Sequence, residues 1–199
     1  GFFLYEVLMR FAEIAGVRQY VTTVGRGAVG VDAQSGKLLW SYNRIANSVA
    51  NIPTPIVCGD NVFVTTSYKT GSALLKITRD GDQCKAEEVW FLEPKDFENH
   101  HGGVVLLGDH LYGGGGQNNG VLTCIEFKTG KIAWQQKPLG KRSAALLSAE
   151  GNLYYRYEDG QMVLVEATPE AFKLKGSFKL AVVNGPSWPH PIIHDGKLY

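Results

Sequence analysis

The chain has 199 residues, of which 44% are hydrophobic and 20% are charged. This composition is typical of a folded globular protein and excludes a disordered chain, which has low hydrophobicity and high net charge. Twenty basic and nineteen acidic residues give a net charge of +1. The sequence therefore lacks the basic excess of a nucleic-acid-binding protein, and no uncharged apolar run is long enough to span a bilayer.

The N-terminal residues fit two structures. Residues 2–14 are compatible with an amphipathic helix, whose apolar side would carry Phe3, Val7, Phe11 and Ile14. The segment Phe11–Ala15 also stands where later parts of the chain have a first strand. The chain begins at Gly1 rather than Met and ends in the strand-like Lys197–Tyr199, which predicts a fragment of a longer protein.

From residue 16 onward, short β-branched and aromatic runs alternate with turn dipeptides. The runs include Gln19–Thr23 and Asn61–Thr66, and the turns include Gly59–Asp60 and Gly108–Asp109. Many short strands at regular spacing predict an all-β protein. The glycine-rich stretch Gly113–Gly120 runs from strand to strand, so it predicts a hairpin rather than a phosphate-binding loop, which leads into a helix.

A longer period runs through these strands. Aromatic residues recur at intervals of 43, 49, 42 and 45 residues, at Tyr20, Phe63, Tyr112, Tyr154 and Tyr199. A period of 40 to 50 residues with four strands each predicts propeller blades. In the second repeat we expect strands at Thr54–Cys58, Asn61–Ser67, Ala73–Thr78 and Glu87–Leu92.

A second pattern supports the same period. The segment Asp32–Trp40 matches Glu126–Trp134, with a glycine four residues after the acid and a tryptophan four residues after the glycine. The acid ends the third strand, the glycine allows a tight turn, and the tryptophan on the fourth strand packs between neighbouring blades. Degraded copies run from Leu75 to Trp90 and from Val163 to Phe178.

These motifs resemble the repeat of the quinoprotein-type, or PQQ-like, β-propeller family, named after pyrroloquinoline quinone. The resemblance covers about Arg18 to Tyr199. Through Asn99–Gly103 and Ser187–Pro191 the chain also resembles uncharacterised bacterial PQQ-like repeat proteins of the planctomycete type. The resemblance implies an all-β propeller domain, with about four four-stranded antiparallel blades of a larger ring. We place a single partial domain at 1–199, with blades at 11–50, 51–98, 99–141 and 142–185 and the start of a fifth at 186–199.

In a propeller the first strand of each blade lines the central channel, so residues that enter these strands converge on one mouth. Aligned turns place a candidate ligand-binding set there: Asn51, Asn99, His100, His101, Arg142, Trp188 and His190. The alternative is that these side chains cap strand ends and satisfy backbone groups. We predict no metal site, because neighbouring histidines on an extended strand point to opposite faces.

The resemblance leaves the function open. Quinoprotein dehydrogenases hold the quinone beside a calcium ion bound by Glu and Asn, use an Asp as base, and stack the quinone on a Cys-Cys pair. This chain has only Cys58, Cys84 and Cys124, with no such pair. We therefore predict a non-catalytic binding or scaffold module without a cofactor, as in the lipoprotein scaffold of the outer-membrane barrel-assembly machine. The alternative is a fragment of a dehydrogenase that uses PQQ and calcium on an alcohol or sugar.

A third interpretation is a hydrolase or lyase that uses the histidine cluster as general base. The expected partner is a protein or a small polar ligand, with no nucleic acid and no membrane span. Exposed blade edges are expected to self-associate. The resemblance implies a periplasmic or exported protein. The sequence itself adds nothing to this expectation, since no signal segment is recognisable in it.

Overall fold

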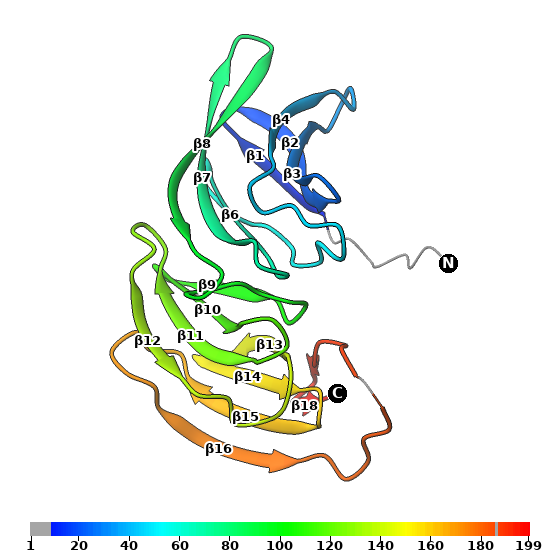
Figure 1. Cartoon of the computed structure of the whole chain (residues 1–199), viewed down its shortest axis with the longest axis vertical. Helices are drawn as coiled ribbons and strands as arrows, with labels where there is room; N and C mark the ends of the chain where they lie inside the picture. The colour runs from blue at the N-terminus through cyan, green and yellow to red at the C-terminus, as the bar shows by residue number, and fades with distance from the viewer. Residues whose placement is uncertain (1–8, 186) are drawn as a thin grey trace. The chain divides into compact units, whose positions relative to one another are not determined.

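A computed structural model describes residues 9–185 and 187–199. The regular structure of this part of the chain is all β: four four-stranded antiparallel sheets and one two-stranded sheet (Figure 1). The chain divides into two compact units, Gly1–Glu98 and Asn99–Tyr199. Each unit holds two of the four-stranded sheets.

In unit 1 the sheets follow chain order, so each is a meander of neighbouring strands. The first sheet, blade 1, consists of β1 (Arg10–Ile14), β2 (Val17–Val24), β3 (Gly27–Asp32) and β4 (Leu38–Tyr42). Blade 2 consists of β5 (Ile56–Cys58), β6 (Asn61–Thr66), β7 (Gly71–Asp80) and β8 (Gln83–Leu92).

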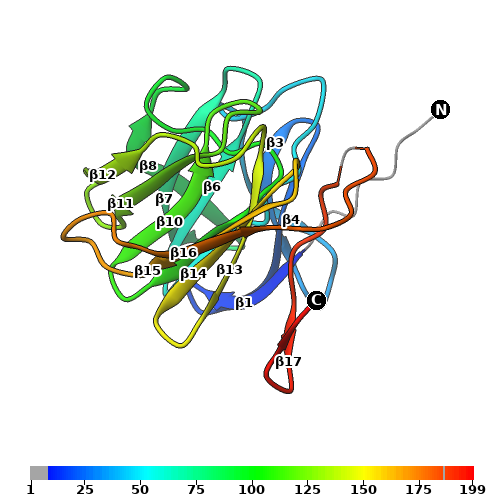
Figure 2. The same ribbon diagram turned by 90° about the horizontal axis from the view of Figure 1, so that it is seen from below.

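Unit 2 repeats the same arrangement. Blade 3 consists of β9 (Val104–Leu107), β10 (His110–Gly115), β11 (Val121–Glu126) and β12 (Ile132–Gln136). Blade 4 consists of β13 (Ala144–Ala149), β14 (Asn152–Tyr157), β15 (Gln161–Glu166) and β16 (Leu174–Lys179). Residues 180–185 and 187–192, orange to red in Figure 2, belong to no strand, and the short hairpin of β17 (Ile193–His194) and β18 (Lys197–Leu198) follows them.

The all-β prediction and the four-stranded blades are confirmed, and the fold is a partial β-propeller. The helical interpretation of the N-terminus is wrong over the residues that can be checked. Arg10–Ile14 is strand β1, which pairs with β2 along its whole length and buries Ile14 completely. Residues 1–8, the rest of that segment, lie outside the described residues.

The acid–glycine motif forms the predicted turn between the third and fourth strands. Asp32 accepts hydrogen bonds from the backbone N–H of Ser35 at 2.6 Å and from its hydroxyl at 2.7 Å. Gly36 has φ +74°, a left-handed conformation that favours glycine. The second copy keeps the side-chain bond and the glycine conformation: the Thr129 hydroxyl donates to the Glu126 carboxylate at 2.7 Å, and Gly130 has φ +73°.

The two tryptophans of the repeat motif, Trp40 and Trp134, pack between the neighbouring blades of their units, as predicted. Trp40 and Trp134 are 4% and 9% exposed and belong to the cores of unit 1 and unit 2, respectively. The indole N–H of Trp40 donates to Gln19 Oε1 at 2.8 Å, and that of Trp134 donates to the Thr168 carbonyl of blade 4 at 2.8 Å. All four blades shift register between the third and fourth strands, a β-bulge that recurs at the same place.

The strand register corrects two positions of the predicted repeat. Val21, not Tyr20, is the β2 residue that pairs with Gly30, which in turn pairs with Trp40. Tyr20 is therefore one residue out of phase with the repeat, and its ring contacts that of Phe11 at the exposed face. In blade 4, Phe178 is not the counterpart of tryptophan, because Gly176 stands opposite Leu164 at the bulge. Blade 4 therefore has no tryptophan at this position.

The β7–β8 hairpin is longer than predicted. Pairing continues through Arg79 and Cys84 to Asp80 and Gln83, which adds residues that we had expected in a loop. Most side chains near the tip are polar or exposed, so no apolar alternation marks the extra strand length in the sequence. The hairpin projects past β4 in Figure 1.

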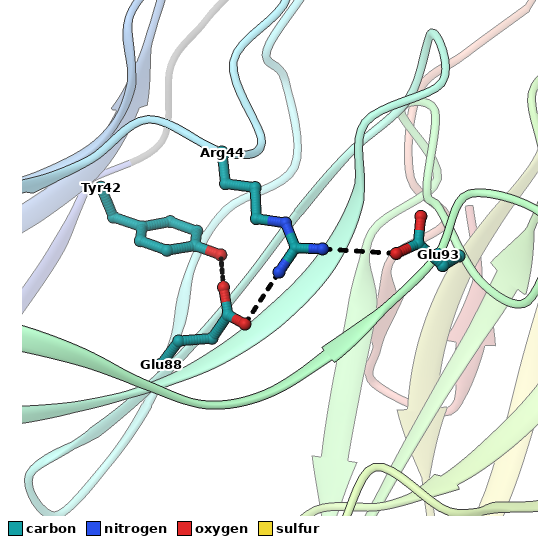
Figure 3. Close-up of polar contacts among 4 residues, drawn as sticks. All are labelled: Tyr42, Arg44, Glu88 and Glu93. Atoms are coloured by element: carbon teal, nitrogen blue, oxygen red, sulfur yellow. Dashed lines mark hydrogen bonds and ion pairs between the residues drawn. The ribbon is translucent and has the colours of Figure 1, made fainter.

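A polar cluster joins the two blades of unit 1 at their outer strands (Figure 3). Glu88 of β8 accepts hydrogen bonds from Tyr42 at 2.5 Å and from Arg44 at 2.9 Å. Arg44 also pairs with Glu93 at 3.3 Å, and its guanidinium lies 3.4 Å from the centre of the Phe91 ring. Partial burial and the Glu88 carboxylate raise the pKa of Tyr42, so this hydroxyl stays protonated and remains a donor.

We expect Gly30→Ala to destabilise the chain by about 1–3 kcal/mol, the usual cost of overpacking a core. A Cβ at this position would lie 2.1 Å from Trp40 Nε1 and 2.7 Å from Gln19 Oε1. Gly25→Ala in the same blade is the control, because a Cβ there meets nothing within 4 Å. Urea unfolding measures both variants; equal stability of the two would contradict the packing of Trp40 described above.

Two tyrosines on β14 give an opposite pair of expectations. The hydroxyl of Tyr155 is buried with no hydrogen-bond partner among the described residues, so Tyr155→Phe should stabilise by about 1 kcal/mol. Tyr157 donates to the Gly120 carbonyl at 2.8 Å, so Tyr157→Phe should destabilise by about 1 kcal/mol. Thermal and urea unfolding compare the two; loss of stability in Tyr155→Phe would show that its hydroxyl has a partner.

Candidate functional site

The two asparagines of the predicted site hold the loops that precede first strands. In unit 1, Asn51 donates to the Asn47 carbonyl at 2.8 Å and accepts from the Asn47 backbone N–H at 3.2 Å. In unit 2, the fully buried Asn99 donates to the carbonyls of Gly103 and Gly114 at 3.1 and 2.9 Å. Both side chains therefore shape the chain entry into a blade, and their participation in binding stays a prediction.

The other predicted residues meet in unit 2, around a carboxylate that the sequence analysis missed. We call this set the mouth cluster: His100, His101, Arg142, Glu158, Trp188 and His190. His101 Nε2 lies 3.2 Å from Glu158 Oε1, and Arg142 Nη1 lies 3.7 Å from Glu158 Oε2. The ring of His101 lies 4.3 Å from that of His100 and 5.5 Å from that of Trp188, measured between centroids.

The strand pairing of blade 4 explains how Glu158 reaches the site. Ala144 at the start of β13 pairs with Tyr157 at the end of β14, so the residues just outside this pair, Ser143 and Glu158, are neighbours. The Glu158 N–H donates to the Ser143 carbonyl at 3.1 Å. In an antiparallel meander the end of a second strand always lies beside the start of the first, so this position was predictable from the repeat alone.

Three further contacts set the positions of the cluster. The Ser143 hydroxyl lies 2.9 Å from His100 Nδ1. Arg156 donates to the carbonyl and hydroxyl of Ser187 at 3.0 and 2.6 Å, which holds the chain next to Trp188. His190 Nδ1 donates to the Leu146 carbonyl at 3.2 Å. The cluster thus combines residues from the entry of blade 3, from the entry of blade 4, from the end of β14 and from the segment before β17.

His101 is the unusual member of the cluster. Its side chain is only 9% exposed, yet neither ring nitrogen makes a hydrogen bond to any described residue. Nε2 is close to the Glu158 carboxylate, but the two groups are not aligned as donor and acceptor. A buried polar group without a partner costs on the order of 1–3 kcal/mol, and native structures rarely keep one without a reason.

Burial keeps His100 and His101 neutral near pH 7. It lowers the pKa of His100 to about 4, an effect that His101 strengthens and Glu158 opposes. It also lowers the pKa of His101 to about 4, and the nearby His190 acts in the same direction. Near neutral pH, the close approach of His101 to Glu158 is therefore a contact between a neutral ring and a carboxylate rather than an ion pair.

The mouth cluster brings polar side chains together, but within the described part of the chain they do not form a recognisable metal centre. Among residues 9–185 and 187–199, no three His, Cys, Asp or Glu side chains come together as a metal site requires. The prediction of no metal site remains a prediction for the whole protein.

Two cavities lie at turns that join first to second and third to fourth strands, and none of the predicted site residues lines them. A cavity of about 900 Å³ in unit 1 is lined by the β1–β2 and β3–β4 turns of blade 1 and by Gly81–Cys84 of the long hairpin. A second, of about 560 Å³ in unit 2, is lined by residues such as His110, Tyr112 and Glu150. Neither contains a buried side chain without a partner.

Four-stranded meanders with an acid–glycine turn and an inward tryptophan define a quinoprotein-type propeller repeat protein. The family model described as outer membrane protein assembly factor BamB matches residues 10–83 and 82–169, and the chain belongs to this family. No curated protein sequence shows significant similarity to it.

Solved propellers resemble the chain at low sequence identity. A europium-containing methanol dehydrogenase is 16% identical, with a TM-score of 0.63 over 89% of this chain and 42% of that one. The β-propeller domain of Cps50 (Swd1) from Myceliophteria thermophila is 16% identical, with a TM-score of 0.56 over 81% of this chain and 54% of that one. BamB from Moraxella catarrhalis is 12% identical, with a TM-score of 0.46 over 91% of this chain and 63% of that one.

The likenesses to the methanol dehydrogenase and to Cps50 show the fold alone. This chain spans between 42% and 63% of the length of the three proteins. The three cysteines are free and far apart in sequence, and no acidic cluster suitable for calcium is present among these residues. No helix of the described chain has the length and apolar character needed to cross a membrane.

The neutral buried histidines predict a pH dependence. Because their folded-state pKa of about 4 lies below the ordinary 6.5, the unfolded chain binds more protons between these values. The free energy of unfolding should therefore fall by about 2 kcal/mol as the pH drops from 6.5 to 4. This value is smaller than the two pKa shifts alone would give, because both rings keep some contact with solvent.

Urea unfolding at pH 7, 6, 5 and 4 measures this loss. His101→Gln should remove part of it, whereas His194→Gln, at a side chain that is 75% exposed, should leave it unchanged. Carboxylates with lowered pKa values, such as Asp32 and Asp159, lose their contribution only below about pH 4 and do not confuse the result. Constant stability across the window would show that the histidines are not buried as described.

Proposed function

We propose that this chain is a non-catalytic binding module of a larger propeller protein, and that the mouth cluster is its binding site. The observation that supports it most directly is His101, whose buried ring has no partner for either nitrogen among the described residues. Such a group is best explained if something outside these residues completes its hydrogen bonds.

The surroundings of His101 favour binding over catalysis. Its low pKa leaves it a weak base, with little proton-transfer driving force at neutral pH. Ser143 is held against His100, but it is itself only 4% exposed, which argues against a nucleophile that meets substrate. Trp188 and Arg142 remain about half exposed or more, so they offer a contact surface at the edge of the buried groups.

The family description concerns the assembly of outer membrane proteins. On that basis we propose an exported, periplasmic protein whose partner is another protein or a small polar ligand, and which needs no cofactor. The alternative, a fragment of a dehydrogenase that uses PQQ and calcium, requires quinone and calcium ligands from parts of the protein other than the described residues.

Photo-crosslinking in the native host tests the proposed site. Benzoylphenylalanine in place of Arg142, which is 61% exposed, should give an adduct of a partner protein or a small molecule in the intact mass. The same probe in place of Lys128, which is 74% exposed on the β11–β12 turn, is the control.

The adduct at position 142 should fall at least fivefold when Trp188→Ala is added, and no adduct should form from position 128. Equal adducts from both positions, or none from position 142, would contradict a binding site at the mouth cluster.

A further inference from the structure

The mouth cluster is balanced in charge. Glu158 carries one negative charge, Arg142 one positive charge, and burial keeps His100 and His101 neutral. A charged ligand would therefore lose its hydration on binding, while the opposite charge that it needs is already paired within the cluster. The cluster is matched to a neutral ligand.

The hydrogen-bonding groups of the cluster are mixed. A neutral imidazole has one N–H donor and one acceptor nitrogen, and both nitrogens of His101 lack a partner among the described residues. Glu158 adds carboxylate acceptors, and Arg142 adds guanidinium donors beside them. A hydroxyl group both donates and accepts, so neighbouring hydroxyls satisfy this alternation better than an amine or a carboxylate does.

Trp188 supplies an apolar wall next to these groups. Its residue is 48% exposed, and its ring centre lies 5.5 Å from that of His101. A flat indole beside polar groups suits a ligand whose ring has one apolar face and hydroxyls around its rim. Polar groups without net charge beside an aromatic wall favour a ligand whose ring carries several hydroxyl groups.

Access to His101 requires a movement of the chain around Trp188. The ring nitrogens of His101 have almost no contact with solvent, although Trp188 itself is half exposed. In the described structure the Ser187–His190 segment is held to blade 4 by the Arg156–Ser187 and His190–Leu146 hydrogen bonds. Because the Trp188 ring lies beside that of His101, we expect the loosening of these bonds to be the movement that uncovers the nitrogens.

We propose that the mouth cluster binds a neutral saccharide, with its ring against Trp188 and its hydroxyls bonded to His101, Glu158 and Arg142 after the Ser187–His190 segment shifts. This inference rests on the proposed function and specifies its ligand class. Free sugars and the glycans of a larger polymer or partner share this chemistry.

Isothermal titration calorimetry of the full chain tests the proposal with three neutral trisaccharides: maltotriose, cellotriose and N,N′,N″-triacetylchitotriose. Trigalacturonate and unacetylated chitotriose are the anionic and cationic comparisons. We expect at least one neutral trisaccharide to bind with a Kd between about 10 µM and 1 mM, and the charged sugars to bind at least tenfold more weakly. Absence of binding by all three at 10 mM, or tighter binding of a charged sugar, overturns the proposal.

Variants locate the binding. Trp188→Ala, at an exposed position that should not disturb folding, and the isosteric Glu158→Gln should each raise the Kd at least tenfold. His194→Ala should leave it unchanged, because His194 is 75% exposed and outside the cluster. Unchanged affinity in Trp188→Ala would show that the saccharide does not bind at the mouth cluster. If circular dichroism shows that Glu158→Gln does not fold, Trp188→Ala alone locates the binding site.

The movement of the segment has its own test. Ser187→Ala removes the 2.6 Å bond to Arg156 and should lower the Kd at least twofold, because less free energy is needed to open the site. An unchanged or higher Kd overturns the required shift. The crosslinking experiment separates the two proposals: an adduct from position 142 without saccharide binding rejects only the saccharide, whereas failure of both rejects the binding site itself.

Discussion

The packing of one blade face against the next is the interaction on which each unit depends. A four-stranded sheet has two faces, and an apolar face must be covered to be stable. In unit 1, Trp40 and Val21 of blade 1 join Val62 and Leu75 of blade 2 in one core. Beside the recurrent bulge, Trp40 pairs with Gly30 of β3 and Trp134 pairs with Cys124 of β11. Trp40 packs so closely on Gly30 that a Cβ at this position would have no space. The blades can therefore differ widely in surface residues while keeping the same core.

The mouth cluster uses the ends of strands that this packing holds in place. His101 enters blade 3, while Glu158 leaves the second strand of blade 4, and the shared core of unit 2 fixes the distance between them. Some polar groups near strand ends lack a hydrogen-bond partner among the described residues. The unpartnered nitrogens of His101 are such a case, and they distinguish this edge of unit 2 from the cavities at the other turns.

Periodicity predicted more of the fold than of the site. The acid–glycine–tryptophan spacing correctly indicated the turn at Gly36 and the burial of Trp40, because both follow from local backbone geometry and strand alternation. The same reasoning put Tyr20 one residue out of phase and missed the outer part of the β7–β8 hairpin, where polar residues conceal the pairing. Glu158 was overlooked because it lies at the end of a second strand, whereas the search followed only the entries to first strands.

The repeat, the class of fold and the strand ends that form a site could all be predicted from the residues alone. These properties depend on spacing along the chain, which a repeat preserves even when individual residues change. Three properties became visible only in the folded chain. Asn51 and Asn99 bond their own loops, His101 lies beside Glu158, and the His101 ring is buried without a partner among the described residues. Burial and the direction of a side chain depend on neighbours distant in sequence, and no local pattern records them.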